Sequence, residues 1–159
     1  MALVRILVDG YSLLHNWPQL APGHPRHSAA ARDELIHVLT RYQDAIHTAV
    51  TIVFDGGGAP ADTPRPDSTP EMEVIYSGAG QTADDIIERV AFRIRDFGEA
   101  LVVTDDFAER DTVLALDGLA SSCLNFIHEV EKVLQQQERD ITQRNRRESA
   151  RFKEAKSAK

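Results

Sequence analysis

Near its N-terminus the chain reads Leu3-Val4-Arg5-Ile6-Leu7-Val8-Asp9-Gly10, an apolar run that ends on an acidic residue. The run predicts a buried strand, and Asp9-Gly10 is typical of the turn that ends one. The same pattern returns three times along the chain, over residues 49–54, 72–76 and 100–103. Each of these predicted strands is followed by an aspartate, either directly or at the start of the next helix.

Helical patterns separate the predicted strands. We expect helices over about 28–47 and 82–97, another that follows Asp106, and a long final one capped by Ser121 or Ser122. Strands that alternate with helices predict βαβ units with right-handed crossovers. The expected fold class is therefore α/β, with a central, mostly parallel sheet in a three-layer α/β/α arrangement.

A single α/β domain followed by a long C-terminal helix is expected. We assign residues 1–120 to the α/β domain and 121–159 to a C-terminal helix. The apolar stripe of that helix stops near Ile141, so the part beyond should project from the body. The segment 56–70 is rich in Gly, Pro, Asp and Thr, and is expected to form a mobile loop.

Composition points to an ordinary soluble protein in the cytoplasm. Cys123 is the only cysteine of the 159 residues, which excludes an internal disulfide and a thiolate metal cage. No stretch resembles a signal peptide or is long and apolar enough to cross a bilayer, so no membrane partner is expected.

The charge is unevenly distributed. The formal net charge is −7, yet eight basic and only three acidic residues follow from Arg139 onward. A basic arm on an acidic body suits a protein that holds a phosphate backbone with one part and cations with another. The alternative is that the basic helix is a solvated surface that serves solubility.

Acidic residues follow all four predicted strands: Asp9, Asp55, the pair Asp84-Asp85, and the pair Asp105-Asp106. The carboxyl ends of parallel strands share one edge of a sheet, where ligands bind at the switch point. A structural alternative exists for each, because Asp-Gly is common turn chemistry. Thr82-Ala83-Asp84-Asp85 also resembles a capping box, which would occupy Asp85 and leave Asp84 free.

Convergent carboxylates repel one another unless a cation compensates. Oxygen ligands without a His or Cys cluster favour one or two Mg²⁺ or Mn²⁺ ions over Zn²⁺. Such a site can polarise a phosphodiester, activate water and stabilise the leaving oxygen. Every lysine lies in the final helix, which argues against receiver and haloacid-dehalogenase-type folds. The absence of a Gly-Lys-Ser/Thr motif argues against a bound nucleotide cofactor.

Taken in order, the motifs resemble those of the YacP-like NYN domains of the PIN-like nuclease superfamily. The resemblance covers most of the chain, including the basic helix. The matching stretches are Ile6-Leu7-Val8-Asp9-Gly10-Tyr11-Ser12-Leu13-Leu14, Trp17-Pro18, Val53-Phe54-Asp55, Glu73-Val74-Ile75-Tyr76, Thr82-Ala83-Asp84-Asp85-Ile86-Ile87-Glu88 and Val103-Thr104-Asp105-Asp106.

The resemblance implies a PIN-like (Rossmann-like) fold and a metal-dependent endoribonuclease, with RNA and, as in some relatives, the translating ribosome as partners. By position, Asp9, Asp84 and Asp106 match the acidic residues of the family. Asp55 matches a frequent fourth, and Asp105 is either an extra ligand or a helix cap. The chain has Ser12 where the family usually has Asn, a shorter hydrogen-bonding side chain that could weaken activity.

Substrate contacts are expected from residues beside these acids and from the tail. Tyr11 could stack an unpaired base or simply pack over the first helix. The full set of expected substrate-binding residues is Tyr11, Ser12, Arg110, Arg144, Arg146 and Arg147. Two other readings remain open: a catalytically weak RNA- or ribosome-binding module of the same fold, and a metal-dependent phosphatase for small esters. The basic tail favours a polymer over a small ester.

Overall fold

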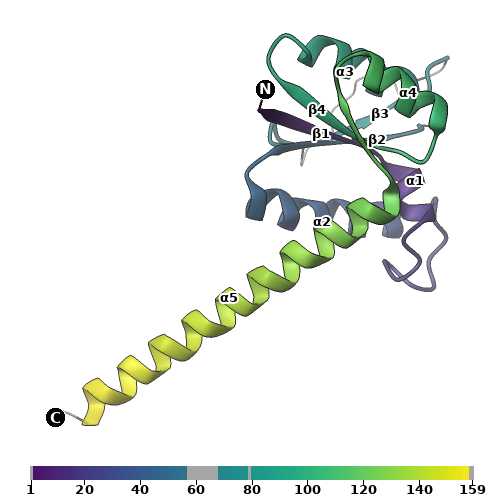
Figure 1. Ribbon diagram of the computed structural model, residues 1–159. Helices are drawn as coiled ribbons and strands as arrows, with labels where there is room; N and C mark the ends of the chain where they lie inside the picture. Colours follow the sequence, from purple (N-terminus) through teal and green to yellow (C-terminus); the bar gives the residue numbers. More distant parts are fainter. Residues whose placement is uncertain (1, 57–67, 79, 158–159) are drawn as a thin grey trace.

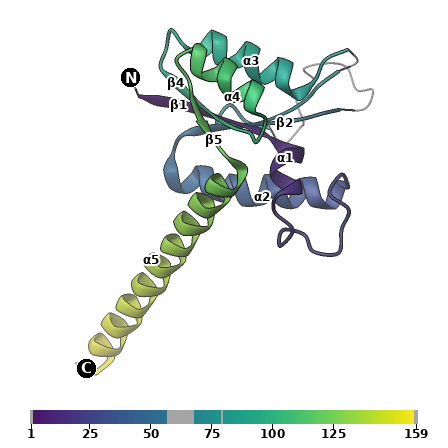
Figure 2. The same ribbon diagram turned by 45° about the vertical axis from the view of Figure 1, so that its right-hand side comes forward.

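The fold is built on a five-stranded parallel sheet with the strand order β3-β2-β1-β4-β5. The computed structural model describes residues 2–56, 68–78 and 80–157 (Figures 1 and 2). The strands are β1 (Leu3–Asp9), β2 (Ala49–Phe54), β3 (Met72–Tyr76), β4 (Glu99–Val103) and β5 (Leu119–Ser121).

Helices cover both faces of the sheet, which gives the expected three layers. The helices are α1 (Gly10–His15), α2 (Ala29–Ile46), α3 (Ala83–Ile94), α4 (Phe107–Ala115) and α5 (Cys123–Ser157). The helices α1, α2 and the start of α5 lie on one face, and α3 and α4 lie on the other (Figure 1). The predicted fold class is confirmed.

Alternating side chains of the central strands feed two apolar cores. Ile6 and Val8 of β1 point to the face of α2 and α5, whereas Leu7 points to the face of α3 and α4. All three are buried, as expected for a strand covered on both sides. This alternation places the next residue, Asp9, on the face of α3 and α4.

Strand order and register bring the ends of β1 and β4 together. The chain runs from β1 outward to β2 and β3, and then returns to add β4 and β5 on the other side of β1. Asp9 is level with Val53 of β2, and Val8 is level with Val103 of β4. The switch point, where ligands bind in open α/β sheets, therefore lies between Asp9 and Thr104.

The turn after β1 is a helix start, which the sequence did not predict. Asp9 caps α1 by accepting a hydrogen bond from the backbone N–H of Ser12. Gly10 is required there because a Cβ at this position would overlap the ring of Phe54. The close approach fixes the direction in which the chain leaves β1.

The last helix extends well beyond the body. Its buried residues are Cys123, Phe126, Ile127 and Val130, all near its N-terminus. The rest of α5 runs away from the sheet as a single straight helix (Figures 1 and 2). The serine that caps it is Ser122, whose Oγ accepts from the N–H of Asn125.

The predicted loop 56–70 falls largely on residues 57–67, which lie outside the described residues. None of the described helices is long and apolar enough to cross a membrane.

Candidate metal centre

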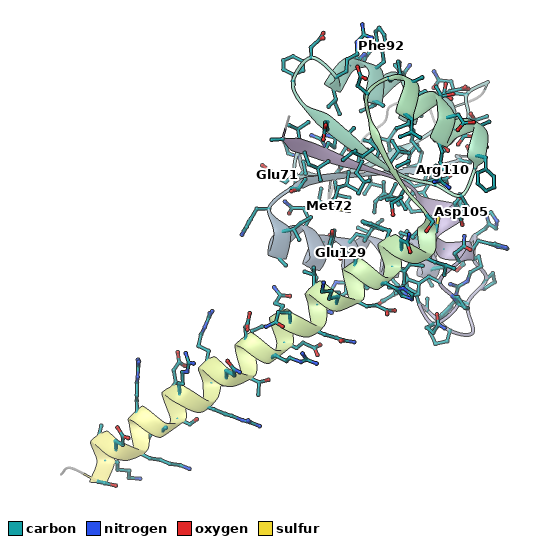
Figure 3. The ribbon with its side chains drawn as sticks, in the orientation of Figure 1. Glu71, Met72, Phe92, Asp105, Arg110 and Glu129 are labelled. Atoms are coloured by element: carbon teal, nitrogen blue, oxygen red, sulfur yellow. The ribbon has the colours of Figure 1, made fainter. Side chains whose placement is uncertain are left out.

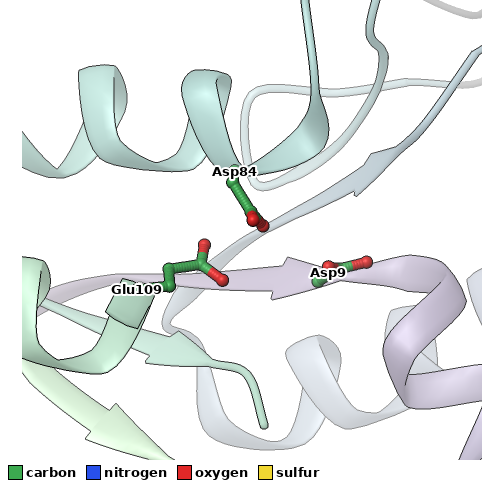
Figure 4. Close-up of side chains that lie close together, drawn as sticks. All are labelled: Asp9, Asp84 and Glu109. Atoms are coloured by element: carbon green, nitrogen blue, oxygen red, sulfur yellow. The ribbon is translucent and has the colours of Figure 1, made fainter. Parts of the chain in front are cut away.

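Three carboxylates converge at the C-terminal edge of the sheet. Asp9, Asp84 and Glu109 each offer an oxygen, and these oxygens lie within 4.8 Å of one another (Figure 4). They form a group of potential metal ligands among the residues that the structure describes. The three side chains come from the end of β1, the first turn of α3 and the first turn of α4.

Local structure explains why Asp84 is free to join this group. The α3 start has a complete capping box in which Thr82 accepts from the N–H of Asp85, and the Asp85 carboxylate accepts from the N–H of Thr82. This confirms the capping box expected from the sequence. Asp84 takes no part in it, and its side chain points toward Asp9 and Glu109 (Figure 4).

Glu109 is the most buried acid of the three, with 2% of its surface exposed. Its Oε2 accepts a hydrogen bond of 2.7 Å from the hydroxyl of Thr104, which is itself 1% exposed. Its Oε1 is buried and receives no hydrogen bond from a donor, and the carboxyl interacts with that of Asp84, which raises the pKa of Glu109. Leaving a buried carboxylate oxygen without a partner is costly, so this atom calls for a ligand.

The hydroxyl of Thr104 makes two hydrogen bonds to the segment 106–109, one at each of its ends. It donates to Glu109 and accepts a 3.1 Å hydrogen bond from the N–H of Asp106. Thr104 directly follows β4, so the strand end fixes the hydroxyl, and the hydroxyl fixes the carboxylate.

The electrostatics of the group oppose its full ionisation without a cation. The pKa of Glu109 is raised to about 8: burial is the largest cause, the Thr104 hydrogen bond opposes it, and the neighbouring Asp84 and Asp9 add to the rise. Burial also raises the pKa of Asp9, against hydrogen bonds from Ser12 that lower it, and Asp84 and Asp55 add to the rise. A divalent cation between these oxygens would reverse the balance.

The stability of the metal-free protein should therefore fall as pH rises. The pKa of Glu109 is higher in the folded than in the unfolded chain, so its stabilising contribution is complete below the unfolded value of 4.5 and is lost as pH rises to about 8. One pKa unit is worth about 1.4 kcal/mol, so even part of this shift amounts to a few degrees in melting temperature.

Calorimetry in EDTA at pH 5.5 and 8.5 tests this expectation on wild type and Glu109→Gln. The difference between the two melting temperatures should be smaller in the variant, because glutamine does not titrate. Adding Mn²⁺ at pH 8.5 should restore stability to wild type only. The same pH dependence in both proteins would assign the effect to other groups.

The other predicted acids occupy structural positions. Asp55 accepts a 2.6 Å hydrogen bond from the N–H of Ala83, which joins the end of β2 to the start of α3. Asp105 accepts from the N–H of Cys123 at 3.0 Å and so ties the β4 end to the start of α5. Asp106 caps α4 by accepting from the N–H groups of Ala108 and Glu109. The position expected for Asp106 in the cluster is thus taken by Glu109, one helical turn later.

Residues beside the acids have defined contacts. The backbone N–H of Ser12 donates to Asp9, and the Ser12 side chain lowers the pKa of that carboxyl, so Ser12 acts directly on a candidate ligand. The ring of Tyr11 packs between Phe54 and His27, at centroid distances of 5.1 and 4.4 Å. Its hydroxyl accepts from Arg32. Tyr11 therefore packs against neighbouring rings, and its side chain is also partly exposed to solvent.

The predicted cationic contacts are divided between two places. Arg110 follows Glu109 on α4, and its guanidinium lies 5.6 Å from the ring centre of Phe107. Figure 3 shows Arg110 on the side of α4 that faces the start of α5, where Asp105 also lies. Arg144, Arg146 and Arg147 are on the exposed part of α5, away from the acidic edge.

Comparison with known proteins identifies the family. The family model for the YacP-like NYN domain matches residues 6–159. The chain belongs to the YacP-like NYN domain family. The match begins within β1 and includes α5, so it covers all the elements that build the acidic edge.

Relatives of this NYN domain agree in sequence and in fold. YacP of Bacillus subtilis (strain 168) is 29% identical over 137 residues, which cover 86% of this chain and 80% of YacP. The crystal structure of Rae1 (YacP) from Bacillus subtilis superposes with a TM-score of 0.75 at 28% identity, covering 94% of this chain and 85% of that one. The W164L mutant of the same protein gives a TM-score of 0.74 at 28% identity, with coverages of 89% and 83%.

Membership of the NYN family supports a nuclease-like, RNA-related function, and the acidic group could hold a divalent metal ion. All three potential ligands are carboxylates, which suit hard cations such as Mg²⁺ and Mn²⁺. Glu109 gives a second reason, because its carboxylate belongs to this group and its Oε1 is a buried acceptor that receives no hydrogen bond from a donor.

Proposed function

We propose that this NYN domain is a divalent-metal-dependent endoribonuclease of the cytoplasm, which hydrolyses RNA phosphodiester bonds, with mRNA in a ribosomal context as its target. The observation that carries the proposal is the convergence of Asp9, Asp84 and Glu109 at the switch point of the sheet, with one oxygen of Glu109 buried and without a hydrogen-bond donor. A cation bound there would polarise a phosphodiester and lower the pKa of a water molecule.

The chain's own residues have separate roles in this proposal. Asp9, Asp84 and Glu109 hold the cation and, through it, fix where the scissile phosphate lies. Ser12 orients Asp9, and Thr104 orients Glu109, each through the hydrogen bonds described above. Asp55, Asp105 and Asp106 hold the ends of the helices that carry or flank the group. We place Arg110 and the partly exposed Tyr11 next to the bound RNA.

A polymer substrate fits the charge distribution better than a small phosphate ester. The basic part of α5 is exposed from Glu138 to Ser157 and lies far from the acidic edge (Figure 1). A small ester bound at the edge would not reach it, whereas an RNA chain can occupy both. Substrate capture is thereby assigned to α5 and bond cleavage to the sheet edge.

A second candidate is a binding module that retains the fold and has little turnover, as Ser12 suggests. The hydrogen bonds from Ser12 to Asp9 favour the enzyme over this candidate, because the shorter side chain still orients a ligand.

A direct assay separates the two functions. Purified protein is incubated with 5′-labelled single-stranded RNA in Mn²⁺, in Mg²⁺ and in EDTA, and products are resolved on a sequencing gel. Internal cleavage with either ion and none in EDTA is the expected result. Asp84→Asn is the control, since Asp84 has no role in the capping box and its loss should leave α3 intact.

Cleavage that persists in EDTA or in Asp84→Asn would contradict the proposal and point to a contaminating nuclease. Binding of the RNA without cleavage in any ion would favour the second candidate.

A further inference from the structure

The exposed part of α5 carries its charges on distinct faces. Every residue from Glu138 to Ser157 is exposed, and beyond Glu138, which pairs with Arg41 of α2, this part runs away from the other described elements (Figures 1 and 3). A helix turns 100° per residue, so residues seven apart lie almost directly above one another. Arg139, Arg146 and Lys153 have this spacing and form one line along the helix.

The surface between these three cations is small and hydroxyl-bearing. Two shallow depressions lie along this part of the helix. Thr142 lines both of them, the first with Arg139 and Arg146 and the second with Arg146 and Lys153. Ser149 and Ala150 line the second depression. We call the set Arg139, Thr142, Arg146, Ser149 and Lys153 the basic stripe.

No acidic residue lies three or four positions from a cation of the basic stripe. Side chains pair along a helix at spacings of three and four residues. At those spacings Arg139 has three glutamines and Thr142, and Arg146 has Thr142, Gln143, Ser149 and Ala150. Around Lys153 they are Ser149, Ala150, Lys156 and Ser157. Two acidic residues flank Arg139 in the sequence: Glu138 is engaged by Arg41 of α2 at 3.9 Å, and Asp140 accepts a hydrogen bond from Gln136.

A second group of three cations on α5 differs in this respect at two of its positions, since Arg147 also has no acidic residue three or four positions away. Arg144, Arg147 and Arg151 lie on another face of the helix. Arg144 has Asp140 and Glu148 four residues away on either side, and Arg151 has Glu148 and Glu154 three residues away. We call the face that carries Arg144, Arg147 and Arg151 the mixed face. It has three cations, as the basic stripe does, but the nearby acidic residues partly cancel its positive field.

We propose that the basic stripe binds the sugar-phosphate backbone of RNA, and that the mixed face does not. This inference rests on the proposed function and assigns RNA capture to one face of α5. The three unpaired cations attract phosphates, while the hydroxyls of Thr142 and Ser149 can donate hydrogen bonds to them. No aromatic residue lies in the stripe, so bases are not stacked and binding is independent of sequence. The acidic body repels RNA, so a site outside the body is needed.

Two charge-matched triple variants test the proposal. One is Arg139→Gln/Arg146→Gln/Lys153→Gln in the stripe, and the other is Arg144→Gln/Arg147→Gln/Arg151→Gln on the mixed face. Each removes three positive charges and keeps residues that favour helices. Circular dichroism confirms that α5 is folded in both. Binding is measured by fluorescence anisotropy with a labelled 30-nucleotide single-stranded RNA in EDTA, between 50 and 200 mM salt.

The stripe variant should bind at least about tenfold more weakly, and its slope of log affinity against log salt should fall by about 2, since each lost phosphate contact removes about 0.7. The mixed-face variant should lose less than a third as much in either quantity. Equal losses in both would overturn the proposal, because only net charge would matter. Displacement of the RNA by poly-glutamate of equal charge concentration would also overturn it, in favour of an acidic protein partner. Cleavage of an eight-nucleotide RNA by the wild-type protein in Mn²⁺ is measured separately. This control tests the proposed nuclease activity independently of RNA binding by the basic stripe.

Discussion

Replacing Glu109 by glutamine is expected to abolish both cation binding and RNA cleavage, while Asp106→Asn leaves cation binding nearly unchanged. Glu109 contributes a carboxylate oxygen to the acidic group and its Oε1 is buried without a donor, whereas Asp106 is occupied in capping α4. Loss of a residue that merely supports a ligand costs about 10–100-fold in metal affinity, and loss of a direct ligand should cost more. Mn²⁺ affinity from isothermal titration calorimetry gives a readout that is independent of cleavage.

The two variants are matched by design. Asparagine caps helices as well as aspartate does, so Asp106→Asn preserves the start of α4 and removes only the charge. Glutamine keeps the size of Glu109 and can still accept a hydrogen bond from Thr104. If Asp106→Asn loses Mn²⁺ binding and Glu109→Gln keeps it, the ligand set indicated by the family resemblance is right and the geometric one is wrong.

Asp9→Asn is expected to lower metal-dependent cleavage by at least about 1,000-fold, or about 4 kcal/mol in transition-state stabilisation. Asp9, the last residue of β1, offers one of the three converging oxygens, so its charge contributes directly to cation binding. The same change should raise the melting temperature in EDTA, because it removes repulsion from Asp84 and the cost of burying a charge. Asparagine can still accept from the N–H of Ser12, so α1 should stay capped.

Measuring both properties on one preparation excludes a trivial loss of activity through unfolding. A variant that has lost cleavage and melts at a lower temperature in EDTA would indicate a structural role for Asp9. A variant with wild-type cleavage would show that the activity belongs to another site.

Strands with a strong apolar signal were predicted almost to the residue, whereas short elements were missed. The predicted strands 49–54 and 72–76 are observed as β2 and β3 with those bounds. The strand β5 (Leu119–Ser121) has three residues and no β-branched one, so neither pattern nor propensity marks it. The helix α1 was missed because Asp9-Gly10 signals a tight turn as strongly as a helix cap.

The site shows a similar division. The convergence of Asp9 and Asp84 follows from the strand order and was expected. Glu109 was missed because Asp106-Phe107-Ala108-Glu109 has the spacing of a capping box, in which the second acid merely serves the helix start. One signal could have revealed it: Glu109 and Val113 are four residues apart and both face inward, so an acid occupies a core-facing position of α4. The sequence alone does not show that Thr104 accompanies it there.

The length of α5 sets a scale for how RNA could be handled. The helix begins where Asp105 accepts from the N–H of Cys123, close to the acidic edge. At about 1.5 Å per residue, Arg139 lies about 24 Å and Lys153 about 45 Å along the helix from that point. If the basic stripe binds RNA and the acidic edge cleaves it, the length of α5 sets a minimum separation between the bound nucleotides and the cleaved one. RNAs shorter than this span would be cleaved without contacting the basic stripe. Only longer RNAs would bind α5 at the same time and so stay bound for longer.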